Sequence, residues 1–367
     1  MPALKYLKVK EHLMEEAMRP EADGRIPSVR QLMKQFGVSL ATVNRALTEL
    51  ESEQVITRRQ GIGISINRRP AAVKLFEKEP KHTLATVVIA CTDYPDEGLW
   101  RKVYMMEQYC RQENIRAVNC KIHSETTVGE IADFVRGVPD CDGAILKMGP
   151  NMLSKNDLLQ LKELAVPVVI LESSYLYDDA PENVFAMIAD PVGTGTLLAE
   201  TLLRSGHRRI GYIRNEPLNE VGELTVKSIT WRLKMGKAPF GPGDVFSAGI
   251  RSWENSLEAA QNVVRQNIGA IRSREITALI FASSAGAFAA LQTLTELGVK
   301  VPDEISLIGE GDRGFCLYTL PRLTVVEADF SEMCRRAVDV ATGRETPSER
   351  QIYFSPRLIE RESVKKL

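Results

Sequence analysis

Short apolar runs alternate with amphipathic stretches over most of the chain, from Leu84 onward. Eight nearly all-apolar runs are typical of strands buried on both faces of a sheet. They are 84–90, 143–148, 167–172, 184–189, 209–213, 278–282, 305–309 and 323–328. Between them, stretches such as 194–206, 256–268 and 286–298 have apolar residues at helical spacing. The alternation predicts an α/β fold, a doubly wound parallel sheet with helices on both faces, in a segment long enough for two lobes.

Residues 1–66 have a different pattern, which predicts short helices followed by a hairpin. Pro27 and Ser28 begin a helix, and Gly37 ends it. Ser39 caps a second helix. Its inward stripe consists of Val43, Ala46, Leu47 and Leu50. The opposite face then carries Ala41, Asn44, Arg45 and Thr48.

The outward face of this second helix and the following hairpin predict DNA binding. Small, amide and guanidinium side chains near a helix N-terminus can reach base edges in the major groove. The stretch 55–66 alternates around Gly61 and Gly63 as a β-wing, and its Arg58, Arg59 and Gln60 can contact phosphate or the minor groove. A helical hairpin that only packs would leave both polar sets unexplained.

The segments IPSVRQL, GVSLATVNRAL and RRQGIG closely resemble the winged helix of the GntR family of bacterial transcription regulators. This resemblance implies DNA contacts from eight residues. They are Arg30, Ser39, Thr42, Asn44, Arg45, Arg59, Gln60 and Gly61. The family often has arginine where Leu40 and Asn44 stand, so the base preference is expected to differ. Leu40 also lies at the edge of the inward stripe, and we expect it in the core.

Charge is distributed unevenly between these two parts of the chain. Residues 1–70 carry 12 Lys and Arg against 8 Asp and Glu, whereas the remainder carries 35 against 40. A basic N-terminal part on an acidic remainder is expected when only the former meets nucleic acid. Residues 67–83 are polar, highly charged and contain two prolines. We therefore predict a winged helix at 1–68, a linker at 69–83 and a two-lobed domain at 84–367.

Several functional classes are disfavoured by what the sequence lacks. The sequence has no run of about 18 apolar residues, so we expect no membrane span. The N-terminus has no apolar signal-peptide core. The cysteines (91, 110, 120, 141, 316 and 334) and histidines (12, 82, 123 and 207) are scattered, which predicts free thiols in the cytoplasm and no metal site. There is no Walker A, H-E-x-x-H or G-x-S-x-G motif, so we expect no enzyme.

The run 187–213, MIADPVGTGTLLAETLLRSGHRRIGYI, is similar to the effector domain of the LacI/GalR regulators. Further similar segments extend the resemblance over nearly all of 84–367. It implies a fold of the periplasmic binding protein type and a ligand bound between two lobes. GntR heads on such domains are used by sugar-responsive repressors. The combination therefore implies a DNA-binding regulator of the repressor type, acting as a homodimer on operator DNA.

Ligands of doubly wound sheets bind at the carboxyl ends of the strands, so polar residues just past those ends are candidates. They are Tyr94, Asp96, Trp100, Lys147, Glu172, Ser173, Asp190, Arg214, Arg251, Trp253, Ser284, Glu310, Asp312 and Glu327. The resemblance implies an aromatic stacking role for Trp100. The family's Asn-Asp pair is replaced by Ser283 and Ser284, and its aspartate by Gly311. These departures predict a small polar effector, a sugar or derivative but not necessarily a simple neutral hexose.

The stretch IGEGDRG (308–314) spells G-x-G-x-x-G, which offers an alternative, an NAD-binding oxidoreductase. In a dinucleotide fold this motif begins a helix whose N-terminus binds the pyrophosphate. Here FCLYTLPRLTVV comes next and leads into another strand. The motif is therefore expected to serve a turn, and no cofactor is predicted.

Overall fold

The computed structural model describes residues 9, 12–13, 27–52, 56–59, 63–66, 84–149, 152–172 and 181–367. The chain separates into two compact units, residues 1–77 and 78–367, which we call the head and the body. The predicted linker, 69–83, lies outside the described residues.

The head contains α2 (Val29–Phe36), α3 (Leu40–Ser52) and an antiparallel hairpin of β1 (Ile56–Arg59) and β2 (Gly63–Ile66). Gly37 follows α2 in the left-handed conformation, with φ of 58°, which glycine adopts without a steric penalty. Leu32 of α2 and Ile56 of β1 pack against α3. The residues of α3 in this core are Val43, Ala46, Leu47 and Leu50, all completely buried. The predicted inward stripe is confirmed.

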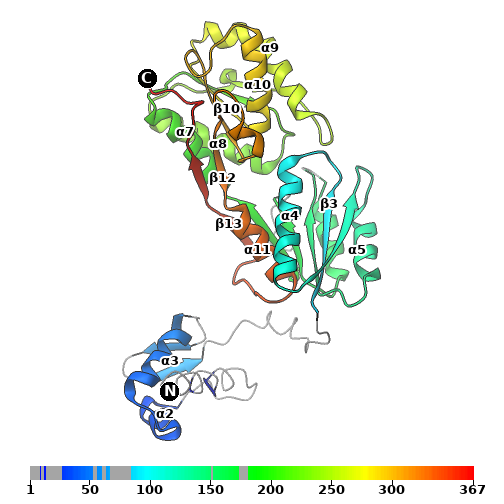
Figure 1. The fold of residues 1–367 in the computed structure, drawn as a ribbon, viewed down its shortest axis with the longest axis vertical. Coiled ribbons are helices and arrows are strands. Elements are labelled where there is room, and N and C mark those ends of the chain that lie inside the picture. Colours follow the sequence, from blue (N-terminus) through cyan, green and yellow to red (C-terminus); the bar gives the residue numbers. More distant parts are fainter. Residues whose placement is uncertain are drawn as a thin grey trace. The chain divides into compact units, whose positions relative to one another are not determined.

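The body has two lobes, each built on a six-stranded sheet (Figure 1). In lobe 1 the strands are parallel, in the order β13-β7-β6-β5-β3-β4. Their bounds are β3 (Thr86–Thr92), β4 (Arg116–Ile122), β5 (Gly143–Lys147), β6 (Val168–Leu171), β7 (Val184–Ala189) and β13 (Gln351–Phe354). One face is covered by α4 (Glu97–Gln112) and α11 (Phe330–Ala341), and the other by α5 (Val128–Gly137), α6 (Lys155–Gln160) and η2 (Leu161–Glu163).

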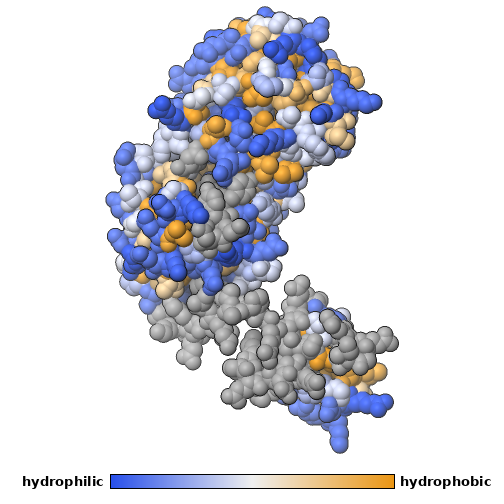
Figure 2. Space-filling model, turned by 180° about the vertical axis from the view of Figure 1, so that it is seen from behind, coloured by the Kyte–Doolittle hydropathy of each residue, from blue (hydrophilic) through white to orange (hydrophobic). Residues whose placement is uncertain are grey.

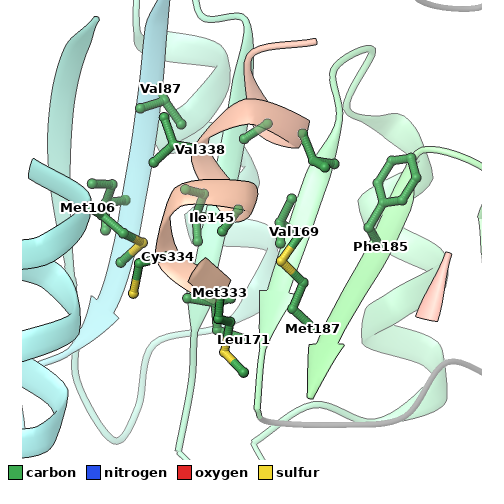
Figure 3. Packing of buried hydrophobic residues seen from close by; sticks show 14 of the residues in the cluster. Val87, Met106, Ile145, Val169, Leu171, Phe185, Met187, Met333, Cys334 and Val338 are labelled. Carbon is green, nitrogen blue, oxygen red and sulfur yellow. The ribbon is translucent and has the colours of Figure 1, made fainter. Parts of the chain in front are cut away.

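Helix α11 lies directly on the lobe 1 sheet, and Figure 3 shows Met333 and Val338 on the side of this helix that faces Ile145 and Val169. All four side chains are completely buried. The approach is close because β5 begins with Gly143. A Cβ at this position would lie 1.8 Å from the carbonyl oxygen of Ala341, the last residue of α11. Glycine is therefore required here for packing.

Lobe 2 has the strand order β14-β12-β11-β10-β8-β9, with β14 antiparallel to β12 and the other pairs parallel. Its strands are β8 (Ile210–Arg214), β9 (Val245–Ser247), β10 (Ala278–Phe281), β11 (Ser306–Glu310), β12 (Thr324–Ala328) and β14 (Pro356–Ile359). Its helices are α7 (Pro191–Arg204) and α8 (Glu220–Met235) on one face, and α9 (Ser256–Ser273) and α10 (Ser284–Glu296) on the other. The short helices are η3 (Pro242–Asp244) and η4 (Gly314–Leu317).

The chain passes between the lobes three times, at 189–191, 328–330 and 354–356. Lobe 1 is therefore completed by α11 and β13, which come after most of lobe 2 in the sequence. The amide of Asp190 donates a hydrogen bond of 2.9 Å to the carbonyl of Phe354 and so joins two of the crossings.

All eight predicted strands are present within a few residues of their predicted bounds. Four strands were not predicted, namely β4, β9, β13 and β14, and these are the four sheet edges. The antiparallel β14 also departs from the expected parallel arrangement. On the surface in Figure 2, polar side chains lie among apolar ones over the described residues. No helix in the described ranges is long and apolar enough to span a membrane.

Candidate DNA-binding surface and ligand cleft

The starts of α2 and α3 are each stabilised by a hydrogen bond between a backbone amide and a side chain. The carboxamide oxygen of Gln31 accepts a hydrogen bond of 2.8 Å from the backbone amide of Ser28, before α2. At α3, the Ser39 hydroxyl accepts one of 3.3 Å from the amide of Thr42. Such caps satisfy amides that have no partner within a helix. They fix where α3 begins and therefore which side chains its N-terminal turns present.

The structure describes the side chains of four predicted DNA-contacting residues. Those of Arg30, Ser39 and Asn44 are exposed, whereas Thr42 is half-buried with its hydroxyl 2.9 Å from that of Ser39. Arg45 lies on α3 and Arg59 on β1, but their side chains are outside the description. Gln60 and Gly61 lie outside the described residues. Arg30 is on α2 and the other three are at the start of α3, so the arrangement suits a helix that inserts its N-terminal end into a groove.

The expectation that Leu40 belongs to the core is wrong. Its side chain is 52% exposed at the first position of α3. The first turn of the helix precedes the inward stripe, which begins at Val43. Leu40 is therefore an apolar residue on the surface of the head, beside the residues predicted to contact DNA.

The body contains a cavity of about 340 Å³ whose walls come from both lobes. Lobe 1 contributes the end of β3 with α4 and the ends of β5 and β6, whereas lobe 2 contributes the ends of β8, β10 and β11. These are the carboxyl ends of parallel strands, where doubly wound folds bind ligands. A volume of this size is at the lower end of the range for small-molecule sites. We call this cavity the cleft.

A charged cluster from lobe 1 lines the cleft. The Glu172 carboxylate accepts a hydrogen bond of 2.5 Å from Nζ of Lys102 and lies 3.8 Å from Nζ of Lys147. Burial acts to raise the pKa of Glu172, but the two ammonium groups outweigh it and hold this pKa below its ordinary value. Burial lowers the pKa of Lys147, and Glu172 opposes that change. The ammonium of Lys102 also lies 3.7 Å from the centre of the Phe330 ring.

Lobe 2 contributes two carboxyl groups, those of Glu310 and Glu216, whose pKa values are raised by burial. Glu310 ends β11, and burial raises its pKa to about 7, with a further contribution from the charge of Glu172. Among the described residues the carboxyl of Glu310 has no hydrogen-bond partner. Burial also raises the pKa of Glu216, whose Oε1 accepts a hydrogen bond of 2.6 Å from the hydroxyl of Ser283. Both carboxyls can accept hydrogen bonds from a ligand.

Polar contacts between the lobes close one side of the cleft. Arg313 forms a salt bridge of 2.9 Å with Asp96, which caps α4. Arg101 of α4 donates to the carbonyl of Asp312 and lies 3.2 Å from the Glu327 carboxylate. On another side, the Tyr94 hydroxyl donates a hydrogen bond of 2.8 Å to the carbonyl of Glu254. The lobes are therefore held together around the cleft.

Aromatic rings form part of the wall of the cleft. Tyr94 of lobe 1 and Trp253 of lobe 2 meet edge to face, with ring centroids 6.0 Å apart. Trp253 has a positive φ of 74°, which is unusual for a non-glycine residue and sets the direction of its side chain. An aromatic wall beside paired charges can contact both the apolar and the polar faces of a small ligand.

Two family models match the chain. Residues 6–66 match bacterial regulatory proteins of the gntR family, and residues 199–364 match a periplasmic binding protein-like domain. The chain joins a GntR-type head to a periplasmic binding protein-like body.

Curated relatives cover nearly the whole chain. The arabinose metabolism transcriptional repressor of Geobacillus stearothermophilus is 26% identical over 99% of this chain and 98% of its own length. The transcriptional regulator GanR of Bacillus subtilis is 24% identical over 92% of this chain and 99% of its own length. Both relatives are transcriptional regulators, in agreement with the prediction of a regulator rather than an enzyme, and neither supports the oxidoreductase alternative.

Solved structures share the fold of the body. The lac repressor dimer bound to operator has a TM-score of 0.62 at 19% identity, covering 82% of this chain and 100% of that chain. A LacI-family regulator from Enterococcus faecium with bound ribose has a TM-score of 0.64 at 18% identity, covering 77% and 99%. The predicted two-lobed architecture is confirmed.

Most of the residues predicted to bind the effector line the cleft. They are Tyr94, Asp96, Lys147, Glu172, Arg214, Trp253, Glu310, Asp312 and Glu327. Ser173 lies outside the described residues. The rule that polar residues follow strand ends therefore located nine residues of this wall.

Four candidates do not line the cleft. Trp100 is exposed on α4, because helical periodicity directs the preceding Leu99 toward the cleft instead. Asp190 caps α7 by accepting a hydrogen bond from the amide of Val192. Arg251 is exposed in the loop before α9. Ser284 is completely buried in the first turn of α10.

The residues that the sequence did not reveal lie in two places. Arg101 and Lys102 are on α4 directly after the candidate Trp100, and the sequence did not show which side of this helical turn faces the cleft. Glu216 and Arg313 follow the ends of β8 and β11 as closely as other candidates follow their strands, so the same rule reaches both, although we did not predict them. Ser283 lines the cleft where we predicted Ser284.

The glycines of the G-x-G-x-x-G stretch have packing roles. A Cβ on Gly309 would lie 3.0 Å from the Cα of Ser284, so this glycine lets β11 approach α10. Gly311 has φ of 87°, in the region that favours glycine. Gly314 donates its amide to Oε1 of Glu97 across the lobes at 2.7 Å. The stretch leads into the four-residue η4 rather than a long helix, so the expectation of a turn is confirmed.

Proposed function

We propose that this protein is a cytoplasmic transcriptional repressor that binds operator DNA as a homodimer and releases it when a small sugar-like effector fills the cleft. The observation that carries the proposal is a ligand-sized cleft between two lobes, in the same chain as a GntR-type head. The names of relatives support the class of effector, since one is an arabinose repressor and one structure contains ribose.

The chemistry of the cleft supports an uncharged, polyhydroxylated effector of about monosaccharide size. The cations that line it already face acids, as in the pairs of Lys102 with Glu172 and of Arg313 with Asp96. A ligand with a large net charge would disturb these pairs, whereas hydroxyl groups can both donate to Glu310 and accept from the ammonium groups. The rings of Tyr94 and Trp253 can pack against the C–H faces of a sugar.

Coupling to DNA follows from the position of the cleft. Because its walls come from both lobes, a bound effector favours one arrangement of the lobes over others. An effector changes operator affinity only by its difference in affinity between the two arrangements, commonly about 5- to 150-fold. In a homodimer on a palindromic site, a change in the body alters how well both heads fit their half-sites.

The test begins with selection of binding sites from genomic DNA, followed by titration of selected and random duplexes by fluorescence anisotropy. We expect sequence-selective binding that a sugar from a panel of arabinose, ribose and galactose weakens by about tenfold or more. A sugar acid and an amino sugar test the preference for an uncharged ligand. Equal affinity for random and selected DNA would refute the regulator.

Binding in the cleft can be followed separately through Trp253. The chain has three tryptophans, so a variant with Trp100→Phe and Trp231→Phe leaves Trp253 as the source of tryptophan emission. We expect the effector to change this emission at the concentrations that release DNA. Binding of large apolar compounds alone would refute the sugar-like effector while leaving DNA recognition intact.

A further inference from the structure

Leu40 is an exception among the leucines of the head. Its side chain is 52% exposed at the first position of α3. The other leucines that the structure describes in the head are completely buried, namely Leu13, Leu32, Leu47 and Leu50. A leucine left half in water gives up part of the stabilisation that burial would supply. Its exposure therefore calls for a role other than packing within the head.

The residues next to Leu40 are occupied in starting the helix. The hydroxyl of Ser39 accepts the hydrogen bond from the amide of Thr42 and lies 2.9 Å from the hydroxyl of Thr42. Two hydroxyls that bond to each other have less capacity left for a base edge. Ser39 and Thr42 therefore hold the first turn of α3 in place, and the side chain that this turn presents is that of Leu40.

Asn44 is exposed one helical turn after Leu40, on the same side of α3. Within the described part of the head, its carboxamide has no hydrogen-bond partner. In the major groove a carboxamide pairs with the N6 and N7 edge of adenine, and the apolar group available there is the C5 methyl of thymine. Four residues of helix span about 6 Å, which corresponds to about two base-pair steps.

We infer that Leu40 and Asn44 make the head selective for A·T pairs, with Leu40 packed against a thymine methyl group and Asn44 bonded to an adenine within about two base-pair steps. Arginine and lysine are the usual readers of guanine, and neither position has a cation. A protein partner suits Leu40 less well, because this single apolar side chain lies between the polar Ser39 and Asn44. The inference rests on the DNA binding of the proposed function and adds the bases that these two residues read.

The first experiment selects duplexes from a random pool with the full chain. We expect each half of the selected sites to contain two A·T pairs within about two base-pair steps. Leu40→Arg and Asn44→Arg should each select guanine in place of one of these pairs, because arginine bonds to O6 and N7 of guanine. Leu159→Arg is the matched control. Leu159 is 42% exposed on α6 of the body, so the same change there should leave the selected bases unaltered.

The second experiment removes the thymine methyl group alone. Uracil replaces each thymine of a selected site in turn, in both halves, which keeps the base pairing, and affinity is measured by fluorescence anisotropy. At one position we expect a loss of about fourfold for each methyl group, hence roughly tenfold or more for both halves. Leu40→Ala, whose side chain is too short for this contact, should bind the two duplexes equally. Asn44→Ala should keep the response to uracil and lose the preference for adenine.

Three results would overturn the inference while leaving the regulator intact. They are selective binding that no uracil substitution weakens, a Leu40→Ala variant that responds to uracil as strongly as the unaltered protein, and arginine variants that select the unaltered bases. Equal affinity for random and selected DNA would refute the regulator and the inference together. An unchanged melting temperature shows that each variant is folded, and uracil duplexes with the unaltered protein test the contact without any variant.

Discussion

Replacing Glu310 by glutamine should stabilise the body, and more so at high pH. Burial raises the pKa of Glu310 from 4.5 to about 7, so the folded protein holds this proton more tightly than the unfolded chain does. Each pKa unit corresponds to about 1.4 kcal/mol, so the ionised carboxylate costs the folded state at most about 3 kcal/mol at pH 8. Water in the cleft screens the charge, and about 1–3 kcal/mol is a realistic range.

The sign of the effect depends on pH. Below pH 4.5 the carboxyl is protonated in both states and has no such cost. The cost grows as the pH rises from about 4.5 to about 7, where only the unfolded chain is ionised, and it is fully present above about 7. Glutamine is uncharged throughout. We therefore expect Glu310→Gln to exceed the unaltered protein in free energy of unfolding by about 1–3 kcal/mol at pH 8 and by little near pH 5.

Urea denaturation of the two proteins at pH 5, 6, 7 and 8, without effector, measures this difference. The variant is compared with the unaltered protein at each pH because other acids also titrate over this range. Glu360→Gln, at an exposed site, serves as the control and should change stability by less than about 0.5 kcal/mol. A Glu310→Gln difference that is the same at pH 5 and pH 8, or larger at pH 5, would refute the reasoning.

Three further predictions concern DNA, packing and the crossings. Arg45→Ala should weaken operator binding by about 1–3 kcal/mol without changing effector affinity. An equal loss of affinity for random DNA in anisotropy titrations would show that Arg45 contacts phosphate rather than a base. Gly143→Ala should destabilise the body by about 2–4 kcal/mol in urea, because its Cβ would overlap the carbonyl of Ala341, whereas Gly137→Ala has open space and should be neutral or slightly stabilising. Asp190→Ala should cost about 1 kcal/mol by removing the cap of α7, and no change in urea midpoint would contradict the capping role.

The strands predicted from the sequence are those buried on both faces. β7, VFAMIA, is entirely buried, so its burial is visible as a continuous apolar run. β4, RAVNCKI, has one neighbour in the sheet and several exposed positions, so its apolar residues are interrupted by Arg116 and Asn119. Edge strands need less burial, and their signal in the sequence is therefore weaker.

The cleft could be predicted only where its residues follow strand ends. Glu172 and Glu310 both line the cleft because each lies at the carboxyl end of a parallel strand, β6 in lobe 1 and β11 in lobe 2. Lys102 approaches Glu172 from the third position beyond Leu99 on α4, and that approach depends on how the helix packs on its sheet. The pattern of one helix cannot indicate which of its polar residues will face another element.

The three crossings between the lobes have a consequence for how the chain is synthesised. The head contains only residues before 84, so it can fold while the rest is still being made. Neither lobe of the body has this freedom, because the final strands of both, β13 and β14, are made only after residue 350. A nascent chain released early would therefore carry a folded head on a body with two unfinished sheets. The last residues of the chain therefore decide whether the head is joined to a completed body.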